Sequence, residues 1–397
     1  MSAPTPHEAA EMLADGCDHI STREELEQRL AAGERLHVKL GIDPTGSELH
    51  LGHAVVLNKM QQFVDLGHRV TLLIGDYTAR IGDPSGRNDA RPPMTGEQIE
   101  ANMKTYREQA GKVLDLERIE VMFNSTWLAP LQTSDWIRLM SRATVAQILE
   151  REDFKNRYTS GTPIALHELL YPVAQSYDSV AMEAGVELGG NDQLFNLLLG
   201  RSYQEHFGQR PQICMTVPIL EGTDGVRRMG KSLNNYISLI EPPEEQFGKL
   251  MRLPDELVPR YARLAAFWPA TRIAELDADL EAGRVPPIEA KKRVAEAIVA
   301  RYYGAEAAGA ARERFEKTVQ RRELPEEMPT LRAAGQRKVT ELLVAAGFAE
   351  SKRAAERLIH QGGVRVDGVP VTDTASMLGG DGVVLSVGAR RFVRVVS

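Results

Sequence analysis

The sequence has few cysteines and no long apolar run. Cys17 and Cys214 are the only two cysteines in 397 residues, and their separation suits neither a metal site nor a disulfide framework. This scarcity predicts a reducing, cytoplasmic environment. No apolar run approaches the roughly 18 residues of a membrane-spanning helix. The first residues, MSAPTPHEAAEML, also lack the basic and apolar regions of a signal peptide. We therefore expect a cytoplasmic protein without membrane contact.

An excess of positive charge and two common nucleotide motifs are also missing. The chain carries 48 Lys and Arg against 55 Asp and Glu, a net charge of −7, so any RNA contact must come from a local basic surface. Neither G-x-x-x-x-G-K-[ST] nor G-x-G-x-x-G after a strand occurs, which excludes a P-loop and the usual dinucleotide fingerprint. The composition is 43% hydrophobic and 26% charged, as in ordinary globular proteins, and the length predicts two or three domains.

Short apolar runs alternate with helical patterns in the first half of the chain. Residues 37–43, 68–76, 117–124 and 212–220 are typical of strands, the first three of buried parallel strands. Amphipathic segments at 54–67 and 95–115 separate them. This alternation predicts an α/β fold with a Rossmann-like, doubly wound parallel sheet, whose ligands bind at the carboxyl ends of the strands.

The pattern changes three times along the chain, which predicts the domain organisation. We expect a catalytic domain over 1–240 with a helical insertion at about 125–170, in which the charged stretch 151–161 lies on the surface. Only helical patterns follow in 241–325, which predicts an all-α domain. A linker at 326–336 precedes a small α+β domain over 337–397, where Asp367 and Gly368 predict a hairpin turn.

The stretch KLGIDPTGSELHLGH, Lys39 to His53, places two histidines where a strand gives way to a helix. The first turn of a helix offers free N–H groups and positive partial charge, which suits phosphate. His50 and His53 add further donors, and Gly52 lets a ligand approach the backbone. Taken alone, the pattern fits two surface histidines that cap a helix equally well.

Two other segments have a similar character. The turn GGNDQ, residues 189–193, offers Asp192 as an acceptor for ribose hydroxyls, although a plain turn with a helix cap explains it as well. The loop RMGKS, residues 228–232, places two cations beside a glycine, as in a mobile flap over polyphosphate or in a solvated basic turn.

In this order on a parallel α/β frame, the three segments resemble the class I aminoacyl-tRNA synthetases, with HLGH for the HIGH signature and RMGKS for KMSKS. The remaining motifs resemble the bacterial-type tyrosyl-tRNA synthetases. They are Gly41, Asp43, Pro44 and Thr45, then GDPSG at 82–86, YPVAQSYD at 171–178 and GGNDQ at 189–193. The likeness covers essentially the whole chain, the tail included.

The resemblance implies that tyrosine is activated with ATP, accompanied by Mg²⁺, and is then transferred to the 3′ end of tRNA(Tyr). The tyrosine carboxylate is already an anion, so activation needs alignment and phosphate donors rather than a general base. The resemblance assigns the catalytic roles to Thr45, His50, His53, Arg228 and Lys231. ATP would contact Gly41, Asp43, Gly52, His53, Gly190, Asp192 and Lys231, with no metal site built by the protein.

For tyrosine, the resemblance implies two polar anchors. Its ammonium would meet Asp83, Tyr171 and Gln175, its phenol Asp178, and Gln193 would complete the pocket. Tyr171, Gln175 and Asp178 are four and three residues apart, so a helix aligns them on one face. The plainer interpretation of that spacing is an ordinary helix with a partly buried polar side.

The tail resembles a small RNA-binding fold. Residues 337–397 carry nine Lys and Arg against six Asp and Glu, a net charge of +3. We expect tRNA contacts from Lys352, Arg353, Arg357 and Arg365, although a solvated helix face would have the same pattern. The family also implies a homodimer through the insertion, where Trp127, Trp136 and Leu139 fit an interface or an internal core.

The chain departs from the common family pattern at two positions. Lys39 stands where many relatives have a tyrosine that touches the phenol, and a charge at a strand edge is its plainer interpretation. Arg228 replaces the first lysine of the flap, and a planar guanidinium is not a point charge. Two other functions stay open: a tryptophanyl-tRNA synthetase, and a synthetase relative that only binds RNA.

Overall fold

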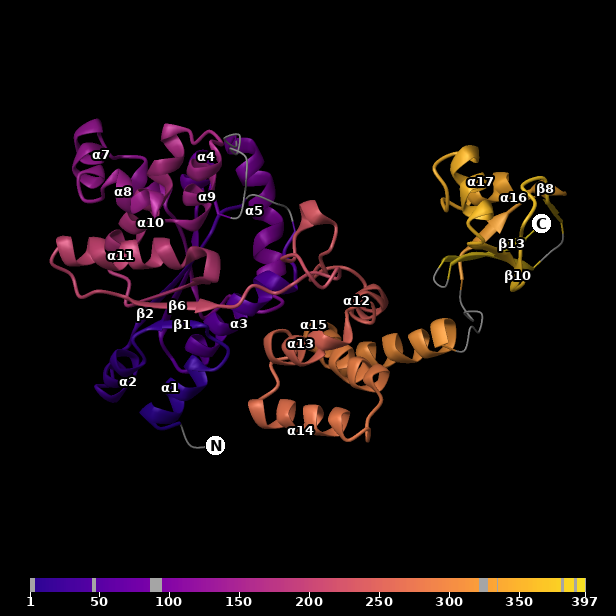
Figure 1. Ribbon diagram of the computed structural model, residues 1–397, viewed down its shortest axis with the longest axis horizontal. Coiled ribbons are helices and arrows are strands. Elements are labelled where there is room, and N and C mark those ends of the chain that lie inside the picture. Colours follow the sequence, from indigo (N-terminus) through magenta and orange to yellow (C-terminus); the bar gives the residue numbers. More distant parts are fainter. Residues whose placement is uncertain are drawn as a thin grey trace. The chain divides into compact units, whose positions relative to one another are not determined.

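The computed structural model describes residues 4–44, 48–85, 95–320, 328–333, 335–379, 382–388 and 391–396. The chain divides into two compact units, Met1–Pro242 with Lys249–Tyr302, and Pro243–Gly248 with Tyr303–Ser397 (Figure 1). This division places much of the predicted all-α region in the same unit as the sheet. The boundaries at 240, 325 and 336 stay predictions.

A six-stranded sheet forms the centre of the first unit, in the order β1-β6-β5-β2-β3-β4. Its strands are β1 (His19–Ser21), β2 (His37–Ile42), β3 (Arg69–Ile74), β4 (Glu120–Phe123), β5 (Val186–Gly190) and β6 (Ile213–Val217). All neighbours pair in parallel except β1, which is antiparallel to β6. The predicted doubly wound α/β class is confirmed, with an antiparallel edge strand that the sequence pattern did not predict.

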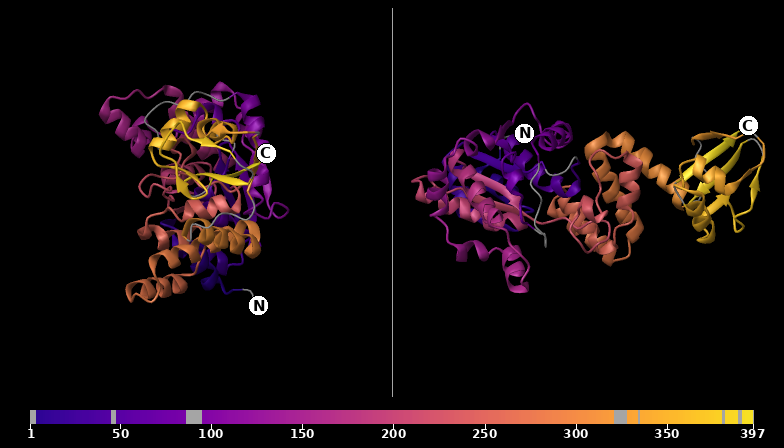
Figure 2. Two further views of the ribbon diagram at one scale, coloured as in Figure 1. Left: turned by 90° about the vertical axis from the view of Figure 1, so that its right-hand side faces the viewer. Right: turned by 90° about the horizontal axis from the view of Figure 1, so that it is seen from above.

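The strand order reverses between β2 and β5. From β2 the chain continues to β3 and β4 on one side, whereas from β5 it continues to β6 on the other. Helix α3 (Leu51–Asp65) links β2 to β3, and α11 (Leu194–His206) links β5 to β6. Helix α11 and its neighbour α10 (Leu170–Ala181) lie on the opposite side of the sheet from α1 (Pro6–Ala14) and α2 (Arg23–Ala31) (Figures 1 and 2). Such a reversal opens a crevice at the strand ends.

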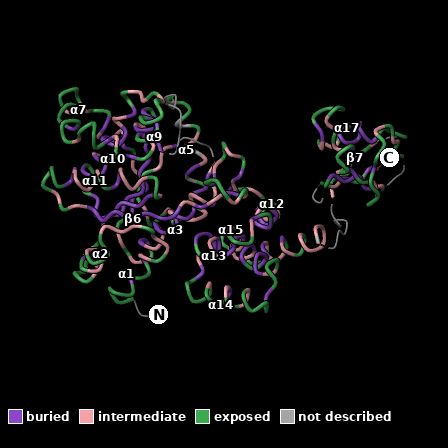
Figure 3. Tube along the Cα trace, viewed as in Figure 1, coloured by how far each residue is buried: buried purple, intermediate pink, exposed green. Residues whose placement is uncertain are grey.

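Burial separates the central strands from the edge. The inner strands β3, β5 and β6 are almost wholly buried (Figure 3), because helices cover both faces of the sheet. The prediction of a buried strand at 117–124 is correct for the strand and wrong for its burial. Strand β4 lies at the edge, where Val121 is 39% and Phe123 is 41% exposed.

The predicted insertion between β4 and α10 is helical. It contains α6 (Ser125–Leu128), α7 (Thr133–Met140), α8 (Val145–Leu149) and α9 (Glu152–Ser160), then a 3₁₀ turn at Leu166–Leu169. Leu139 is buried and packs with Val173, Val180 and Tyr203 of the main domain, so at this position the internal-core interpretation holds. The expectation that 151–161 is a surface segment is wrong in part, because Arg151 and Arg157 are both buried.

The region after the sheet is helical, as predicted. It comprises α12 (Pro243–Leu250), α13 (Val258–Leu264), α14 (Ala270–Glu281) and α15 (Pro287–Phe315), followed by a π-helical turn at Glu316–Gln320. Helix α15 contains a non-helical residue, Gly304, with φ of 84°. This kink lies at the division between the two units, and glycine suits it because glycine adopts positive φ without a steric cost.

The tail is a small α+β domain, as predicted. Helices α16 (Val339–Ala345) and α17 (Lys352–His360) pack with a sheet in the order β10-β9-β12-β13-β7. Its strands are β7 (Thr330–Arg332), β9 (Val364–Val366), β10 (Val369–Pro370), β12 (Val383–Val387) and β13 (Arg391–Val396), and β8 (Arg337–Lys338) pairs separately with β11 (Met377–Leu378). The predicted turn at Asp367 and Gly368 is present, with φ of 43° and 81°. Strand β7 lies inside the predicted linker and pairs in parallel with β13.

Candidate active site

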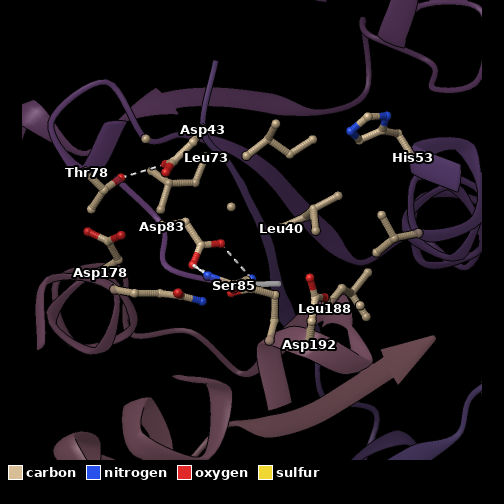
Figure 4. A pocket seen from close by; sticks show the side chains of 18 of the residues that line it. Leu40, Asp43, His53, Leu73, Thr78, Asp83, Ser85, Asp178, Leu188 and Asp192 are labelled. Carbon is tan, nitrogen blue, oxygen red and sulfur yellow. Dashed lines mark hydrogen bonds between the residues drawn. The ribbon is translucent and has the colours of Figure 1, made fainter. Parts of the chain in front are cut away.

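A pocket of about 300 Å³ opens at the carboxyl ends of β2 and β5, at the reversal of the strand order. Asp178 and His53 lie at opposite ends of the labelled lining, with Asp83 between them (Figure 4). Most of the predicted site residues line this pocket: Gly41, Asp43, His53, Asp83, Tyr171, Gln175, Asp178, Gly190, Asp192, Gln193 and Arg228.

Four predicted residues are not part of that lining. His50 and Gly52 belong to the same first turn of α3 as His53, and Lys231 follows Arg228 by three residues in a 3₁₀ turn, Lys231–Leu233. Thr45 lies outside the described residues. The residues predicted to bind tyrosine and ATP therefore lie in one region of the structure, and only the position of Thr45 is not described.

The two histidines contact each other at the start of α3. Their ring centroids are 3.9 Å apart, and the backbone N–H of His50 donates to His53 Nδ1 at 3.3 Å. Burial lowers the pKa of His53 to about 4, and burial together with His53 and Arg228 lowers the pKa of His50 to about 2. Both rings are therefore neutral near pH 7, and they offer N–H donors rather than charge.

Gly52 gives the His50 ring its space. A Cβ at this position would lie 3.0 Å from His50 Nδ1 and 3.1 Å from Cε1. Any side chain there would push the ring aside, which is a more specific reason for glycine than the ligand approach expected from the sequence.

Asp178 sits at the far end of the pocket on α10. Its Oδ1 accepts a hydrogen bond from Trp127 Nε1 at 2.7 Å, and its Oδ2 accepts one from Asn124 Nδ2 at 3.2 Å. Burial raises the pKa of Asp178 to about 7, although Lys39, Trp127 and Asn124 act in the opposite direction. Each carboxylate oxygen retains a lone pair, so the group can accept one more hydrogen bond from a ligand.

Tyr171, about two helical turns before Asp178, faces the end of β2. Its hydroxyl donates to Asp43 Oδ2 at 3.0 Å, and Thr78 donates to Asp43 Oδ1 at 2.8 Å. Burial raises the pKa of Tyr171 well above its ordinary value, and Asp43 raises it further. Asp43 therefore orients Tyr171, a role that the family assignment to ATP did not include. A Cβ on Gly75 would lie 2.0 Å from Asp43 Oδ1, so this carboxylate also depends on a glycine that the sequence motifs did not identify.

Asp83 is surrounded by donors in the middle of the pocket. Its Oδ1 accepts from Arg151 Nη2 at 2.9 Å and from the Ser85 hydroxyl at 2.6 Å, while its Oδ2 accepts from Gln193 Nε2 at 2.8 Å. Burial alone would raise the pKa of Asp83, but Arg151 and Ser85 outweigh it and the pKa lies below its ordinary value. Asp83 is therefore an anion at neutral pH, with Arg151 as its counterion.

Arg151 is a site residue that the sequence motifs did not reveal. Its guanidinium also donates to Asn196 Oδ1 at 3.1 Å and pairs with Asp153 at 3.0 Å. The signal was hidden because the charged run around it, EREDFKNR, has the composition of a solvated face. Only the fold shows that this arginine turns inward.

The loop at residues 228–232, the predicted flap, lies at the histidine end of the pocket. Arg228 Nη1 lies 3.9 Å from Asp192 Oδ2, and Lys231 Nζ lies 3.4 Å from Glu48 Oε1. These cations are 41% and 52% exposed. Asn235 anchors the backbone of this loop. Its Oδ1 accepts a hydrogen bond from the Gly230 N–H at 2.9 Å, and its Nδ2 donates one to the Arg228 carbonyl at 3.1 Å. Two positive groups thus lie beside the helix turn that carries the histidines.

Lys39 contradicts its plainer interpretation as a charge at a strand edge. Strand β2 is central, between β5 and β3, and the Lys39 side chain is 1% exposed. Its Nζ lies 3.1 Å from Glu187 Oε1.

The predicted RNA-binding residues lie on the tail. Lys352, Arg353 and Arg357 are exposed on α17, and the same helix buries Ala355 and Ile359. Arg365 follows on β9, is exposed, and donates to the Gly368 carbonyl at 3.0 Å. Within the described parts of the chain, no group of three or more His, Cys, Asp or Glu side chains is placed to hold a metal ion, and no helix has the length and apolar character to cross a membrane.

Comparisons with known proteins agree with this geometry. Residues 31–320 match the family model described as tRNA synthetases class I (W and Y), and residues 339–384 match the S4 domain. The chain is 49% identical to the tyrosine–tRNA ligase of Thermotoga maritima, over 98% of both chains. It is 48% identical to that of Bordetella pertussis, over 100% of this chain and 99% of the relative.

Solved structures resemble the fold at lower identity. The tyrosyl-tRNA synthetase of Archaeoglobus fulgidus, complexed with L-tyrosine, aligns with a TM-score of 0.65 at 21% identity, over 77% of this chain and 99% of that one. The enzyme of Aeropyrum pernix gives 0.62 at 24%, over 79% and 99%. At this distance the likeness supports the fold alone.

Proposed function

The chain belongs to the class I tRNA synthetases of the tryptophan and tyrosine type, and from this premise we propose that it joins tyrosine to tRNA(Tyr) at the expense of ATP. Relatives at 45% to 49% identity over nearly the whole chain are tyrosine–tRNA ligases. The observation that carries the choice of tyrosine is Asp178, a buried carboxylate that can accept a further hydrogen bond and lies at the opposite end of the pocket from His53 (Figure 4). A phenol has the O–H that such an acceptor requires.

In the first step, a tyrosine carboxylate oxygen attacks the α-phosphorus of ATP, and the bond to the bridging oxygen of pyrophosphate breaks. Tyrosyl-adenylate forms and pyrophosphate leaves with its Mg²⁺. The attacking group is already an anion, so the protein supplies orientation and charge stabilisation. His50 and His53 contribute neutral N–H donors, and Arg228 and Lys231 contribute positive charge from the flap.

In this proposal the amino acid occupies the half of the pocket that contains Asp83 and Asp178, and ATP occupies the half beside the histidines and the flap. Its ammonium meets the anion Asp83 and the oxygen of Gln175, with Tyr171 held in place by Asp43. Its phenol donates to Asp178. The carboxylate then points toward the histidine end, where Asp192 receives the ribose of ATP.

In the second step, a terminal ribose hydroxyl of tRNA attacks the carbonyl carbon of the adenylate. The mixed anhydride breaks, AMP leaves, and the hydroxyl proton passes to the departing phosphate or to solvent. The exposed cations of α17 and β9 hold the tRNA by its phosphates.

Two further properties belong to the same proposal. The chain works in the cytoplasm, and it forms a homodimer through the insertion. The insertion and the neighbouring strand β4 expose large apolar side chains that have no role in the pocket, namely Phe123, Ile137, Met140, Val145, Tyr158 and Leu166. An apolar surface of this kind favours association.

Tyrosine-dependent ATP–pyrophosphate exchange tests the function. We expect exchange with tyrosine, and none above background with tryptophan or phenylalanine. Exchange driven by tryptophan would establish the tryptophanyl alternative instead. No exchange with any amino acid, together with retained tRNA binding, would establish the RNA-binding alternative.

A further inference from the structure

A buried ion pair lies behind the tyrosine half of the pocket. Lys39 of β2 and Glu187 of β5 stand directly opposite each other on neighbouring strands. Their charged atoms are 3.1 Å apart, and the two side chains are 1% and 2% exposed. Removing two charges from water is costly, and an apolar pair of similar volume is often at least as stable. Stability alone therefore does not account for the pair.

Glu187 fixes a residue that lines the pocket. Its Oε1 accepts from Gln175 Nε2 at 3.1 Å, and its Oε2 accepts from the Ser179 hydroxyl at 3.1 Å. The Gln175 oxygen accepts from Asn196 Nδ2 at 2.7 Å. A carboxylate can only accept, so it decides which end of the Gln175 amide is the nitrogen. The amide oxygen is then held in one orientation, with a second lone pair for a ligand.

The same ion pair lies near Asp178, because Asp178 follows Gln175 by three residues on α10 and Gln175 contacts the Glu187 oxygen that pairs with Lys39. Two uncharged donors, Trp127 and Asn124, reach that carboxylate from the β4 side. The charged groups that influence it are Lys39 from β2 and Glu187 from β5, of opposite sign. Among the other titratable groups of the pocket lining, Asp43, Asp83 and Tyr171 have their own donors or acceptors.

Opposing effects place the pKa of Asp178 close to neutral pH. Burial raises its pKa to about 7, Lys39 lowers it and Glu187 raises it. A phenol needs the ionised form, because a protonated carboxyl has one acceptor site fewer and competes as a donor. A nearby cation thus decides how much of the protein is ready to receive tyrosine at neutral pH.

We propose that Lys39 and Glu187 are positioning residues for tyrosine selection: Lys39 keeps Asp178 in its acceptor form, and Glu187 orients the amide of Gln175. The proposal rests on the function given above, since it concerns the amino acid that this pocket admits. It also gives Lys39 a role at a position where the family commonly has a tyrosine.

The test is the pH dependence of kcat/KM for tyrosine in ATP–pyrophosphate exchange, from pH 5.5 to 9. In the unchanged protein, kcat/KM falls as the pH drops through the pKa of Asp178. Lys39→Met removes the cation, so this acid limb moves up by about one pH unit and kcat/KM at pH 7 falls about fivefold. Glu187→Gln removes the like charge, so the limb moves down. Opposite shifts from the two partners of one ion pair are expected only if both act on Asp178.

A second readout concerns Gln175. Glu187→Gln allows the amide of Gln175 to turn over, which should weaken binding of tyrosine more than binding of 3-(4-hydroxyphenyl)propionate, the analogue without the ammonium. Lys39→Met should weaken both compounds alike, because both carry the phenol. Equal losses for both compounds in Glu187→Gln would overturn the role assigned to Glu187.

Glu168→Gln provides a matched control, because Arg157 and Glu168 form another buried ion pair, in the insertion and outside the pocket lining. This variant should lose stability without moving the acid limb. A limb that stays in place, or moves in the same direction in Lys39→Met and Glu187→Gln, would overturn the proposal. If Lys39→Met does not fold, the downward shift in Glu187→Gln decides alone. Absence of tyrosine-dependent exchange in the unchanged protein would instead count against the proposed function.

Discussion

The two halves of the pocket hold their charges differently. In the tyrosine half, Asp178 is buried and Asp83 is only 20% exposed, and each accepts at least two hydrogen bonds from fixed donors. In the nucleotide half, Arg228 and Lys231 are about half exposed and face their acidic neighbours at 3.9 Å and 3.4 Å. The first arrangement is preorganised, whereas the second makes long, solvated ion pairs that triphosphate oxygens can replace.

Under the proposed function, the difference follows from the ligand that each half recognises. Tyrosine differs from phenylalanine by one hydroxyl, and selection of that hydroxyl requires a desolvated acceptor in a fixed position. ATP brings several negative charges, and a flap can follow them as pyrophosphate forms and leaves. Changes in the tyrosine half should therefore cost stability as well as activity, while changes in the flap should barely affect stability.

The largest effect is expected for Arg151→Met. This change removes the cation beside Asp83, whose side chain is only 20% exposed, which should lower the free energy of unfolding by about 3–5 kcal/mol and raise the KM for tyrosine. Thermal and urea unfolding measure the first effect, and exchange kinetics the second. Arg23→Met is the control, since Arg23 pairs with Glu11 on the surface and its removal should cost less than about 1 kcal/mol. Equal costs for the two variants would show that the burial of Asp83 and Arg151 has no energetic consequence.

His50→Ala comes next and acts on rate rather than stability. Loss of one preorganised donor should lower kcat for exchange by about 10²- to 10³-fold, with little change in the KM for tyrosine. His206→Ala, an exposed histidine at the end of α11, should leave the rate unchanged. An unchanged rate in His50→Ala would refute the proposed mechanism even though the family is established.

The same histidines give a prediction about pH. Their folded pKa values, about 2 and about 4, lie below the ordinary value of 6.5. Neither ring gains a proton between pH 5 and 8, so the acid limb of the activity profile must come from another group, and Asp178 is the candidate. In His53→Gln, an acid limb that disappears would show that a histidine, and not Asp178, titrates in this range.

Most of the residues that the sequence motifs identified line one pocket, but the contacts among them could not be predicted. The glycines, histidines and carboxylates of the lining could be identified because short motifs carry them. The resemblance assigned Asp43 to ATP. In the structure, its carboxylate accepts hydrogen bonds from the hydroxyls of Tyr171 and Thr78. The hydrogen-bond partners of a carboxylate come from segments far apart in the chain, so no local sequence pattern predicts them.

The elements that the sequence patterns did not reveal have a common cause. Strand β1 has three residues and joins the sheet only at an antiparallel edge, and β7 is a three-residue strand that pairs with the end of the chain. Arg151 and Lys39 have the sequence pattern of surface charges, because their counterions are distant in the sequence. Asp83 lies 68 positions from Arg151, and Glu187 lies 148 positions from Lys39. Composition predicts that charges are solvated, and it fails where the fold supplies an internal partner.

The tail offers a third environment, in which the cations Lys352 and Arg353 are exposed to solvent. In the proposed function they bind tRNA phosphates. Lys352→Ala with Arg353→Ala should leave tyrosine-dependent exchange unchanged and raise the KM for tRNA about tenfold. The salt dependence of tRNA binding should become shallower, by about 0.7–0.9 in log–log slope for each phosphate that the tail no longer binds. Equal losses in exchange and in tRNA charging would contradict a separate RNA-binding role for α17.

The smallest effect is expected for Glu48→Gln in the flap. Glu48 accepts from the Tyr236 hydroxyl at 3.1 Å as well as facing Lys231, and glutamine can keep the hydrogen bond to Tyr236 without the negative charge. Because the ion pair is solvated, stability should change by less than about 1 kcal/mol. The Lys231 ammonium then faces the triphosphate without a competing carboxylate, so the KM for ATP should fall by about two- to threefold, corresponding to a few tenths of a kcal/mol. Titration of exchange against ATP measures this change, with Glu11→Gln as a surface control. A rise in the KM for ATP would mean that Glu48 holds the flap in its binding position, and the contrast between a fixed half and a displaceable half of the pocket would then fail.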